Sequence, residues 1–519
     1  MNGSRGAGRK ALFLPPGLLL CALLLGGGCG FFEGKKPNIL LLSIDTLRAD
    51  HLGCYGNDRW GRSPSPHLDA LAARGVIFER CYAPRGQTHP SIASMLTGKY
   101  PITHGLRENG QGLSEHHPTL AQLLKKAGYA TAGFASNLPV QSDPVQDPEH
   151  SPPAWWTRGF ETCGDGFGGN FAAETGRGKI EDQWRWDERV ERQVEAWIES
   201  YAGGDRSRPF FLWAHFYDPH KPYLPDPSCP DFFPDYEGPL EPETAVENGR
   251  PVDRVGRFID QATRAGRELA PADHRKVLAL YDASLWGVDQ RIGRILEALE
   301  KRGLLENTWI FFTADHGEEL GDHNAYYYHG ASIYNAVLHI PFIAAGPGVP
   351  AGRRLACLVQ NVDLSATVMD LAGVEPPPLT EGIPLTAVLE GKADDPGREF
   401  YAAEWQAAIY AYSDGRYKYI FNPGGTCPKK PPFIAVGGSF KYERFELYDL
   451  EADPGERRNI LEGHKDTAKA LRKRLLRWLN EPGHDPTGRA SILSSGMNRA
   501  MQQLGYTGAD TPGGGRGGR

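Results

Sequence analysis

Two features that would point to common functions are missing from this sequence. The chain has 519 residues and 8 cysteines, but no two cysteines form a CxxC pair, which argues against a zinc–thiolate site. Positive charge is not in excess either, because 57 Lys and Arg stand against 64 Asp and Glu, for a net charge of −7. A nucleic-acid partner is therefore not expected. The acidic balance does not exclude an anion-binding site, because metal ions and local basic groups override it.

A hydrophobic run long enough to cross a membrane is also missing at the N-terminus. Basic residues precede the apolar stretch 11–25, which at 15 residues is shorter than the roughly 20 that a spanning helix needs. Small residues and then Cys29 follow it. This pattern predicts an export signal peptide over residues 1–29. Three outcomes stay open: a lipoprotein anchored through Cys29, plain secretion, or an uncleaved anchor. Each places the protein in the cell envelope or beyond, as a periplasmic, membrane-attached or secreted protein.

Apolar runs typical of buried strands alternate with helix patterns along the chain. The strand-like runs are residues 37–45, 76–78, 129–134, 209–215, 308–314 and 341–344. The helix patterns are residues 65–75, 119–126, 186–201, 277–302 and 362–372. The alternation predicts an α/β fold with a large, mainly parallel sheet sandwiched by helices.

Residue types that can bind metals or anions stand at the end of three of these strands or just after it. They are Asp45, His215, Asp218, His220, Asp315 and His316. Ligands of open α/β sheets bind at the carboxyl ends of the strands, so we expect these side chains to meet there. Carboxylate and imidazole groups are ligands for a divalent cation. Taken alone, each of them is equally compatible with an ordinary turn or loop residue.

A short helix over residues 88–97 is the stretch around which the candidate site is organised. Pro90 stands in its first turn and Gly98 follows its end, as is typical of helix boundaries. Thr88 therefore lies at a helix N-terminus, where unpaired N–H groups and the helix dipole attract anions. A cation beside its hydroxyl would make Thr88 a nucleophile. The alternative is a capping threonine without chemistry.

The pattern changes near residue 397. Short strands are expected at 400–404, 409–413, 417–421 and 445–449, followed by a helix over 465–480. We therefore predict an α/β catalytic domain over 37–395, a C-terminal α+β subdomain with a small antiparallel sheet over 396–482, and a largely disordered tail over 483–519. Residues 139–182 and 224–272 are expected to be a surface excursion and an irregular insert that together set the substrate.

Four segments resemble the sulfatase family within the alkaline phosphatase superfamily. They are residues 38–56, 93–101, 315–318 and 446–456. The resemblance extends over roughly residues 37–480. It implies a divalent metal ion, calcium, manganese or zinc, bound by Asp45, Asp315 and His316, with Thr88 bridging metal and substrate.

The same resemblance implies three residues that contact the substrate. Asn109, His220 and His329 match positions that touch the sulfate or phosphate group and the leaving oxygen. His220 and His329 are the candidates for the acid that protonates the leaving group, although many members have lysine at the position of His329. His215 has no clear family counterpart and is expected to support a metal ligand from behind.

The sequence also departs from the family pattern. Active sulfatases carry Cys or Ser in a C/S-x-P-x-R motif that is oxidised to formylglycine, whereas Thr88 and Ile92 occupy the Cys and Arg positions here. Thr46 replaces the second Asp of the usual Asp-Asp pair. A threonine at position 88 resembles the phosphodiesterases, phosphonate hydrolases and phosphoryl-group transferases of the superfamily, which form a phospho-threonine intermediate.

These observations predict an exported, metal-dependent hydrolase of a sulfuric or phosphoric ester, the latter a phosphodiester or phosphonate, with Thr88 as nucleophile. Two alternatives stay open: a phosphoryl-group transferase acting on an envelope glycan or lipid, and a catalytically inactive protein that binds glycans. The expected partners are one divalent metal ion and an ester substrate, such as a sulfated or phosphorylated glycan or lipid. If the protein carries a lipid anchor, the membrane is a further expected partner.

Overall fold

The computed structural model describes residues 36–138, 154–165, 183–240, 245–247, 250–252, 254–265, 268–330, 332–405, 408–424 and 443–485. The predicted signal peptide and residues 486–519 lie outside this set. The described residues from Pro37 onward belong to one compact unit. No helix in these ranges combines the length and the apolar character needed to cross a membrane. The division at residue 396 and the disorder of the tail stay predictions.

The main sheet has eight strands in the order β12-β2-β11-β8-β1-β5-β3-β4. They are β1 (Asn38–Ile44), β2 (Val76–Tyr82), β3 (Ala130–Ala135), β4 (Thr162–Asp165), β5 (Phe210–Phe216), β8 (Thr308–Ala314), β11 (His339–Ala345) and β12 (Arg353–Gln360). Every neighbouring pair is parallel except the two pairs that β11 makes with β2 and β8. The predicted α/β fold class is therefore confirmed.

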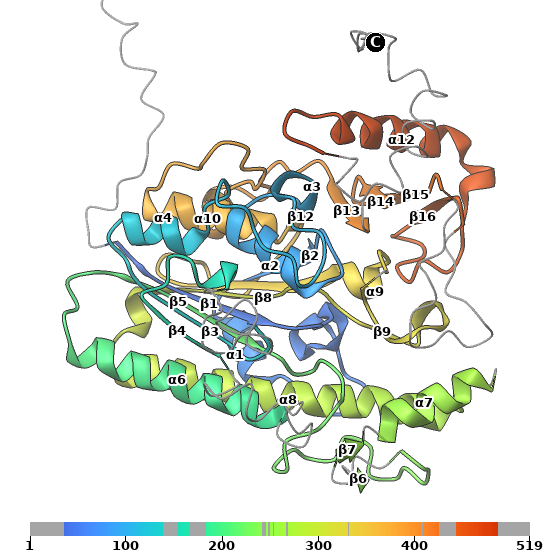
Figure 1. Ribbon diagram of the computed structural model, residues 1–519, viewed down its shortest axis with the longest axis horizontal. Coiled ribbons are helices and arrows are strands. Elements are labelled where there is room, and N and C mark those ends of the chain that lie inside the picture. The colour runs from blue at the N-terminus through green and yellow to red at the C-terminus, as the bar shows by residue number, and fades with distance from the viewer. Residues whose placement is uncertain are drawn as a thin grey trace, which may run out of the picture. The chain divides into compact units, whose positions relative to one another are not determined.

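Helices cover both faces of this sheet (Figure 1). One side carries α2 (Thr88–Thr97), α3 (Pro101–His104), α4 (Leu120–Lys126) and α10 (Val362–Ala372). The other carries α1 (Pro66–Ala73), α6 (Gln183–Gly203) and α8 (Pro271–Lys301). Two short helices, α9 (Asn335–Leu338) and α11 (Thr386–Leu389), complete this part of the chain. The helix patterns in the sequence located α1, α4, α6 and α10 to within about three residues at each end and placed the start of α8 at residue 277 instead of Pro271.

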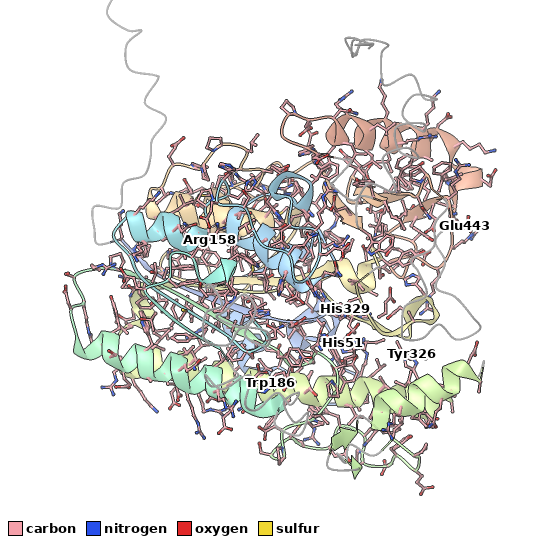
Figure 2. The ribbon with its side chains drawn as sticks, in the orientation of Figure 1. His51, Arg158, Trp186, Tyr326, His329 and Glu443 are labelled. Carbon is pink, nitrogen blue, oxygen red and sulfur yellow. The ribbon has the colours of Figure 1, made fainter. Side chains whose placement is uncertain are left out.

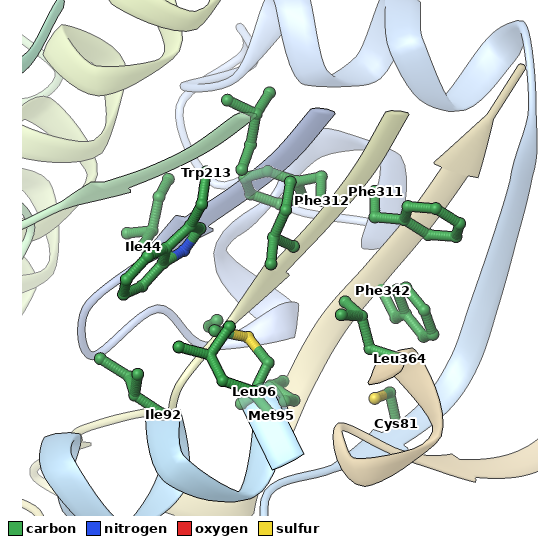
Figure 3. Packing of buried hydrophobic residues seen from close by; sticks show 14 of the residues in the cluster. Ile44, Cys81, Ile92, Met95, Leu96, Trp213, Phe311, Phe312, Phe342 and Leu364 are labelled. Atoms are coloured by element: carbon green, nitrogen blue, oxygen red, sulfur yellow. The ribbon is translucent and has the colours of Figure 1, made fainter. Parts of the chain in front are cut away.

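The predicted boundaries of α2 are confirmed. The helix begins at Thr88, and its last N–H group that bonds within the helix belongs to Gly98, which donates to the Ser94 carbonyl at 2.9 Å. Gly98 has φ of 68°, a left-handed conformation that glycine adopts without strain. Ile92 and Met95 are completely buried and pack near Trp213 in the core of the main sheet (Figure 3). This packing fixes where the N-terminus of α2 lies.

A second, antiparallel sheet has the order β13-β14-β15-β16. Its strands are β13 (Tyr401–Trp405), β14 (Ile409–Ser413), β15 (Tyr417–Phe421) and β16 (Phe445–Asp449), and α12 (Lys465–Leu479) packs against it. A buried ion pair lies just before β13 in the chain: Arg398 Nε donates to Asp363 Oδ2 of α10 at 2.8 Å. The predicted small sheet and its helix are confirmed.

The two inserts are more ordered than expected. Trp156 is only 1% exposed and contacts Trp213 edge to face at 5.6 Å, and β4 joins the main sheet, so the described part of 139–182 is not a surface excursion. The insert at 224–272 contains a hairpin of β6 (Ala245–Glu247) and β7 (Arg250–Val252) and the helix α7 (Arg254–Arg264). A further small hairpin of β9 (Glu319–Leu320) and β10 (Tyr326–Tyr328) follows β8. Residues 139–153 and 166–182 lie outside the described set.

Candidate metal and ester site

The register of three central strands brings the candidate ligands to one face of the sheet. Ser43 of β1 pairs with His215 of β5 on one side and with Thr313 of β8 on the other. Side chains alternate along a strand, so residues two positions on from a pair point the same way. Asp45 and Asp315 are those residues, and the pairing continues to them: the Asp45 N–H donates to the Phe216 carbonyl at 2.9 Å.

The result is a buried cluster of metal-binding groups. Asp45, His215 and Asp315 each offer one ligand atom, and these atoms all lie within 4.8 Å of one another. His316 joins them, with its Nε2 3.5 Å from Asp315 Oδ2 and 3.8 Å from Asp45 Oδ1. All four side chains are at most 1% exposed. The structure thus brings together the three predicted metal ligands and adds His215.

Each side chain in this cluster has one atom fixed and one atom without a partner. Asn137 donates to Asp45 Oδ2, the N–H groups of Thr46 and His316 donate to Asp315 Oδ1, and His316 Nδ1 lies 2.9 Å from the Gly317 carbonyl. In these four side chains, one atom each has no hydrogen-bond partner among the described residues: Asp45 Oδ1, His215 Nε2, Asp315 Oδ2 and His316 Nε2. Buried polar atoms are rarely left unpaired. These four fit a divalent cation, which takes oxygen and imidazole ligands.

The electrostatics of the cluster support the same interpretation. Burial raises the pKa of Asp45 well above its usual value, and the charges of Asp315 and Glu318 raise it further. Burial also raises the pKa of Asp315. Burial lowers the pKa of His215 to about 3, so its imidazole is neutral. Two close carboxylates are costly without a positive partner, and a bound cation removes that cost.

The helix that begins at Thr88 is tied to the end of β8 beside this cluster. Ser91, one turn further along α2, donates its hydroxyl to the Asp315 carbonyl at 2.6 Å and accepts from Asn361 Nδ2 at 2.9 Å. Residues three apart share a helix face, so Thr88 lies on the side of α2 that faces the end of β8. Thr88 is 6% exposed and is the first residue of the helix. The first-turn N–H groups there have no partners within the helix.

Asn109 is oriented by the first turn of α2. Its side-chain oxygen accepts the His89 N–H at 2.9 Å, and Gly110 N–H donates to His89 Nδ1 at 3.2 Å. With the oxygen engaged, the amide nitrogen is the end that can donate to an anion. The structure therefore places Asn109 next to Thr88 in a form suited to bind an anionic oxygen.

The predicted acid candidates form a row of rings beside the cluster. The His329 ring stacks on His316 at 4.6 Å and contacts the His220 ring at 5.3 Å. His329, labelled in Figure 2, has its Nδ1 3.0 Å from Glu318 Oε1. Burial lowers the pKa of His220 to about 3 and that of His329 well below its usual value. Both rings are therefore neutral. To act as an acid, either ring must first take up a proton, which the substrate or Glu318 can supply. Burial raises the pKa of Glu318 to about 7.

Sequence reasoning missed Asn137 and Glu318, whereas His215, expected behind a metal ligand, lies in the cluster itself. Asn137 follows β3 by two residues, so the rule that found Asp45 at the end of β1 also applied to it. Glu318 was part of a recognised motif, but its contact with His329 depends on the fold of the loop between them. Asp218 lies in the same loop as His220 and is buried, without belonging to the four-residue cluster.

Comparison with known proteins decides the family. The profile of the family described as Sulfatase matches residues 37–374. The chain belongs to the sulfatase family. A second profile, described as N-sulphoglucosamine sulphohydrolase, C-terminal, matches residues 321–481 and so includes the small sheet and α12.

Individual relatives are similar over most of their length. An N-acetylglucosamine-6-O-sulfatase of Bacteroides thetaiotaomicron is 27% identical, over 91% of this chain and 91% of the relative. The multifunctional alkaline phosphatase superfamily protein PehA of Trinickia caryophylli is 26% identical, over 82% of this chain and 91% of the relative. The crystal structure of a phosphonate monoester hydrolase of Agrobacterium radiobacter has a TM-score of 0.61 at 23% identity, covering 85% of this chain and 95% of that chain. The prediction of a sulfuric or phosphoric ester hydrolase is confirmed at this level.

Proposed function

We propose that this sulfatase-family chain is a metal-dependent hydrolase of phosphoric esters, phosphodiesters or phosphonates, and that Thr88 is its nucleophile. The observation that carries the proposal is the convergence of four unpartnered, buried ligand atoms where the N-terminus of α2 meets the end of β8. The phosphoric side is favoured over the sulfuric side because a threonine cannot become the aldehyde that active sulfatases use.

The metal-binding residues and Thr88 have separate tasks. A divalent cation bound by Asp45, Asp315 and His316 supplies positive charge that favours the ionised hydroxyl and the negative ester. The Thr88 N–H at the start of α2 and the Asn109 amide then donate to the phosphoryl oxygens as charge develops on them.

The reaction has two steps at one side chain. Thr88 Oγ1 attacks phosphorus as its hydroxyl proton passes to the neutral ring of His220 or His329, the bond from phosphorus to the leaving oxygen breaks, and the protonated ring gives that proton to the leaving oxygen. Water then cleaves the phospho-Thr88 ester and restores the hydroxyl. Neutral rings suit the second step, in which a histidine accepts a proton from water.

The leaving group is proposed to be a sugar or lipid alcohol in the cell envelope. The proposal draws on the relatives, among them the N-acetylglucosamine-6-O-sulfatase. Export follows from the N-terminal pattern, with Cys29 as the proposed site of lipid attachment. If a Cys29→Ser form stays in the membrane fraction, an uncleaved anchor replaces lipidation in this account.

A matched pair of substitutions in α2 tests the proposal. Thr88→Val removes the proposed nucleophile with little change in shape, whereas Thr97→Val removes a buried hydroxyl at the other end of the same helix, which donates to the Ala93 carbonyl at 2.6 Å. With aryl phosphodiesters, phosphonates and sulfates as probes and added zinc or manganese, Thr88→Val should lose at least about 10³-fold in kcat/KM. Thr97→Val should stay within a few-fold of wild type.

The same panel separates the alternatives. Turnover of sulfates alone would contradict the phosphoric assignment. No turnover of any ester by folded, metal-loaded protein would favour the inactive binding protein. Release of product only when a sugar or lipid acceptor is present would favour the transferase.

A further inference from the structure

His215 is the one member of the buried cluster to which neither the family resemblance nor the proposed reaction gives a role. It lies inside β5, is 0% exposed, and offers a ring nitrogen within 4.8 Å of the ligand atoms of Asp45 and Asp315. Its Nε2 has no hydrogen-bond partner within the part of the chain that the structure describes. A buried histidine that only fills space would leave a polar nitrogen unpaired beside two carboxylates, which is unfavourable.

The other ring nitrogen of His215 is held by a chain of hydrogen bonds that is compatible with the metal-binding tautomer. Trp213 Nε1 lies 2.9 Å from Ser43 Oγ, and His215 Nδ1 lies 2.9 Å from the same oxygen. An indole N–H can only donate, so Ser43 Oγ accepts from Trp213 and has a second lone pair for an Nδ1–H donor. In the tautomer in which Nδ1 donates to that lone pair, Nε2 keeps a free lone pair for a metal ion.

Metal-binding histidines have this arrangement. They usually donate the second ring N–H to a nearby oxygen, which fixes the ring and its tautomer. His316 shows the same pattern, with its Nδ1 at 2.9 Å from the Gly317 carbonyl and its Nε2 unpartnered within the described ranges. The two histidines therefore approach the same point from β5 and from the end of β8.

We propose that His215 binds the metal ion directly, so that the site is made of two carboxylates and two imidazoles. This inference rests on the metal dependence of the proposed function. Calcium takes six to eight oxygen ligands, whereas imidazole nitrogens favour zinc and similar transition metals. The site therefore selects zinc over calcium.

A matched pair of histidine substitutions tests this assignment. His215→Phe removes the ligand and keeps a ring of similar size. His104→Phe removes another buried imidazole, whose Nε2 lies 3.0 Å from Ser94 Oγ and whose Nδ1 accepts the Leu106 N–H at 3.1 Å. Zinc and calcium are titrated into each metal-free full-length protein by calorimetry. His215→Phe should weaken zinc binding by more than about 100-fold, and His104→Phe should leave it unchanged. Unchanged zinc affinity in His215→Phe overturns the proposal.

A second measurement needs no variant and keeps the test decisive if His215→Phe fails to fold. X-ray absorption of the zinc-loaded wild-type protein counts the imidazoles in the metal's coordination shell. Two imidazoles support the proposal, and one imidazole, or tighter binding of calcium than of zinc, overturns it. Ester hydrolysis is measured on the same samples. Two imidazoles without hydrolysis would reject the proposed function alone, whereas hydrolysis with one imidazole would reject only the role of His215.

Discussion

Replacing Asp45 by asparagine should stabilise the metal-free protein and abolish its response to metal. Asp45 and Asp315 offer oxygens within 4.8 Å of each other. At that separation and an effective dielectric constant of about 20, two unit charges repel by about 3 kcal/mol. Protonation of one carboxylate relieves part of this repulsion. We therefore expect Asp45→Asn to raise the free energy of unfolding of the metal-free protein by about 1–3 kcal/mol.

Added metal should reverse the order of stability, so that the wild type becomes more stable than Asp45→Asn. A ligand present at 100 times its Kd stabilises the folded state by about 2.7 kcal/mol. Wild-type protein should gain this stability from zinc or manganese, and Asp45→Asn should gain almost none. The assay is thermal and urea unfolding of both proteins, first in chelator and then across a metal titration.

A second buried carboxylate provides the control. Asp289 of α8 is 0% exposed, burial raises its pKa to about 7, and it accepts the N–H groups of His67 and Leu68 at the start of α1. Asp289→Asn should alter stability without changing the response to metal. The reasoning is refuted if Asp45→Asn is less stable than wild type in chelator, or if metal stabilises both equally.

Two further predictions concern stability away from the site. Arg398→Met should destabilise the protein by about 3–5 kcal/mol in urea unfolding, because it leaves the buried Asp363 without its cation, whereas Arg416→Met at an exposed pair should change stability by less than about 1 kcal/mol. A cost below 1 kcal/mol for Arg398→Met would contradict this. Burial alone would lower the pKa of His323, but Glu319 raises it to about 9. The protonated histidine should therefore contribute its full stabilisation below pH 6.5. The free energy of unfolding should fall by at most about 3 kcal/mol as the pH rises through 9. His323→Gln should flatten that part of the pH profile, and an unchanged profile would refute the assignment.

The main sheet and the two candidate metal-binding carboxylates could be predicted because their signals are local. The run from Asn38 to Ile44 is mostly apolar, as in a strand buried on both faces, so the residue that follows it was expected at a strand end. Pro90 and Gly98 marked the limits of α2 in the same way.

Other features depend on partners that are distant in sequence. His215 belongs to the cluster because β5 pairs with β1 in the register that sets it beside Ser43, and a sequence alone does not contain that register. Ser65 stands at the N-cap of α1 but makes no capping bond, and Asp289 from α8 accepts the first N–H groups instead. The edge strands β4 and β12 were missed because pairing on one side only leaves a weaker apolar signal.

The most direct test of the account is to trap the nucleophile. Metal-loaded protein is mixed with an activated aryl phosphodiester or phosphonate, quenched in acid within a single turnover, and mapped by peptide mass spectrometry. We predict a phosphoryl or phosphonyl adduct on Thr88 that decays as product forms and is missing from Thr88→Val. Rapid hydrolysis with no adduct at Thr88, or with an adduct on another residue, would contradict the central claim.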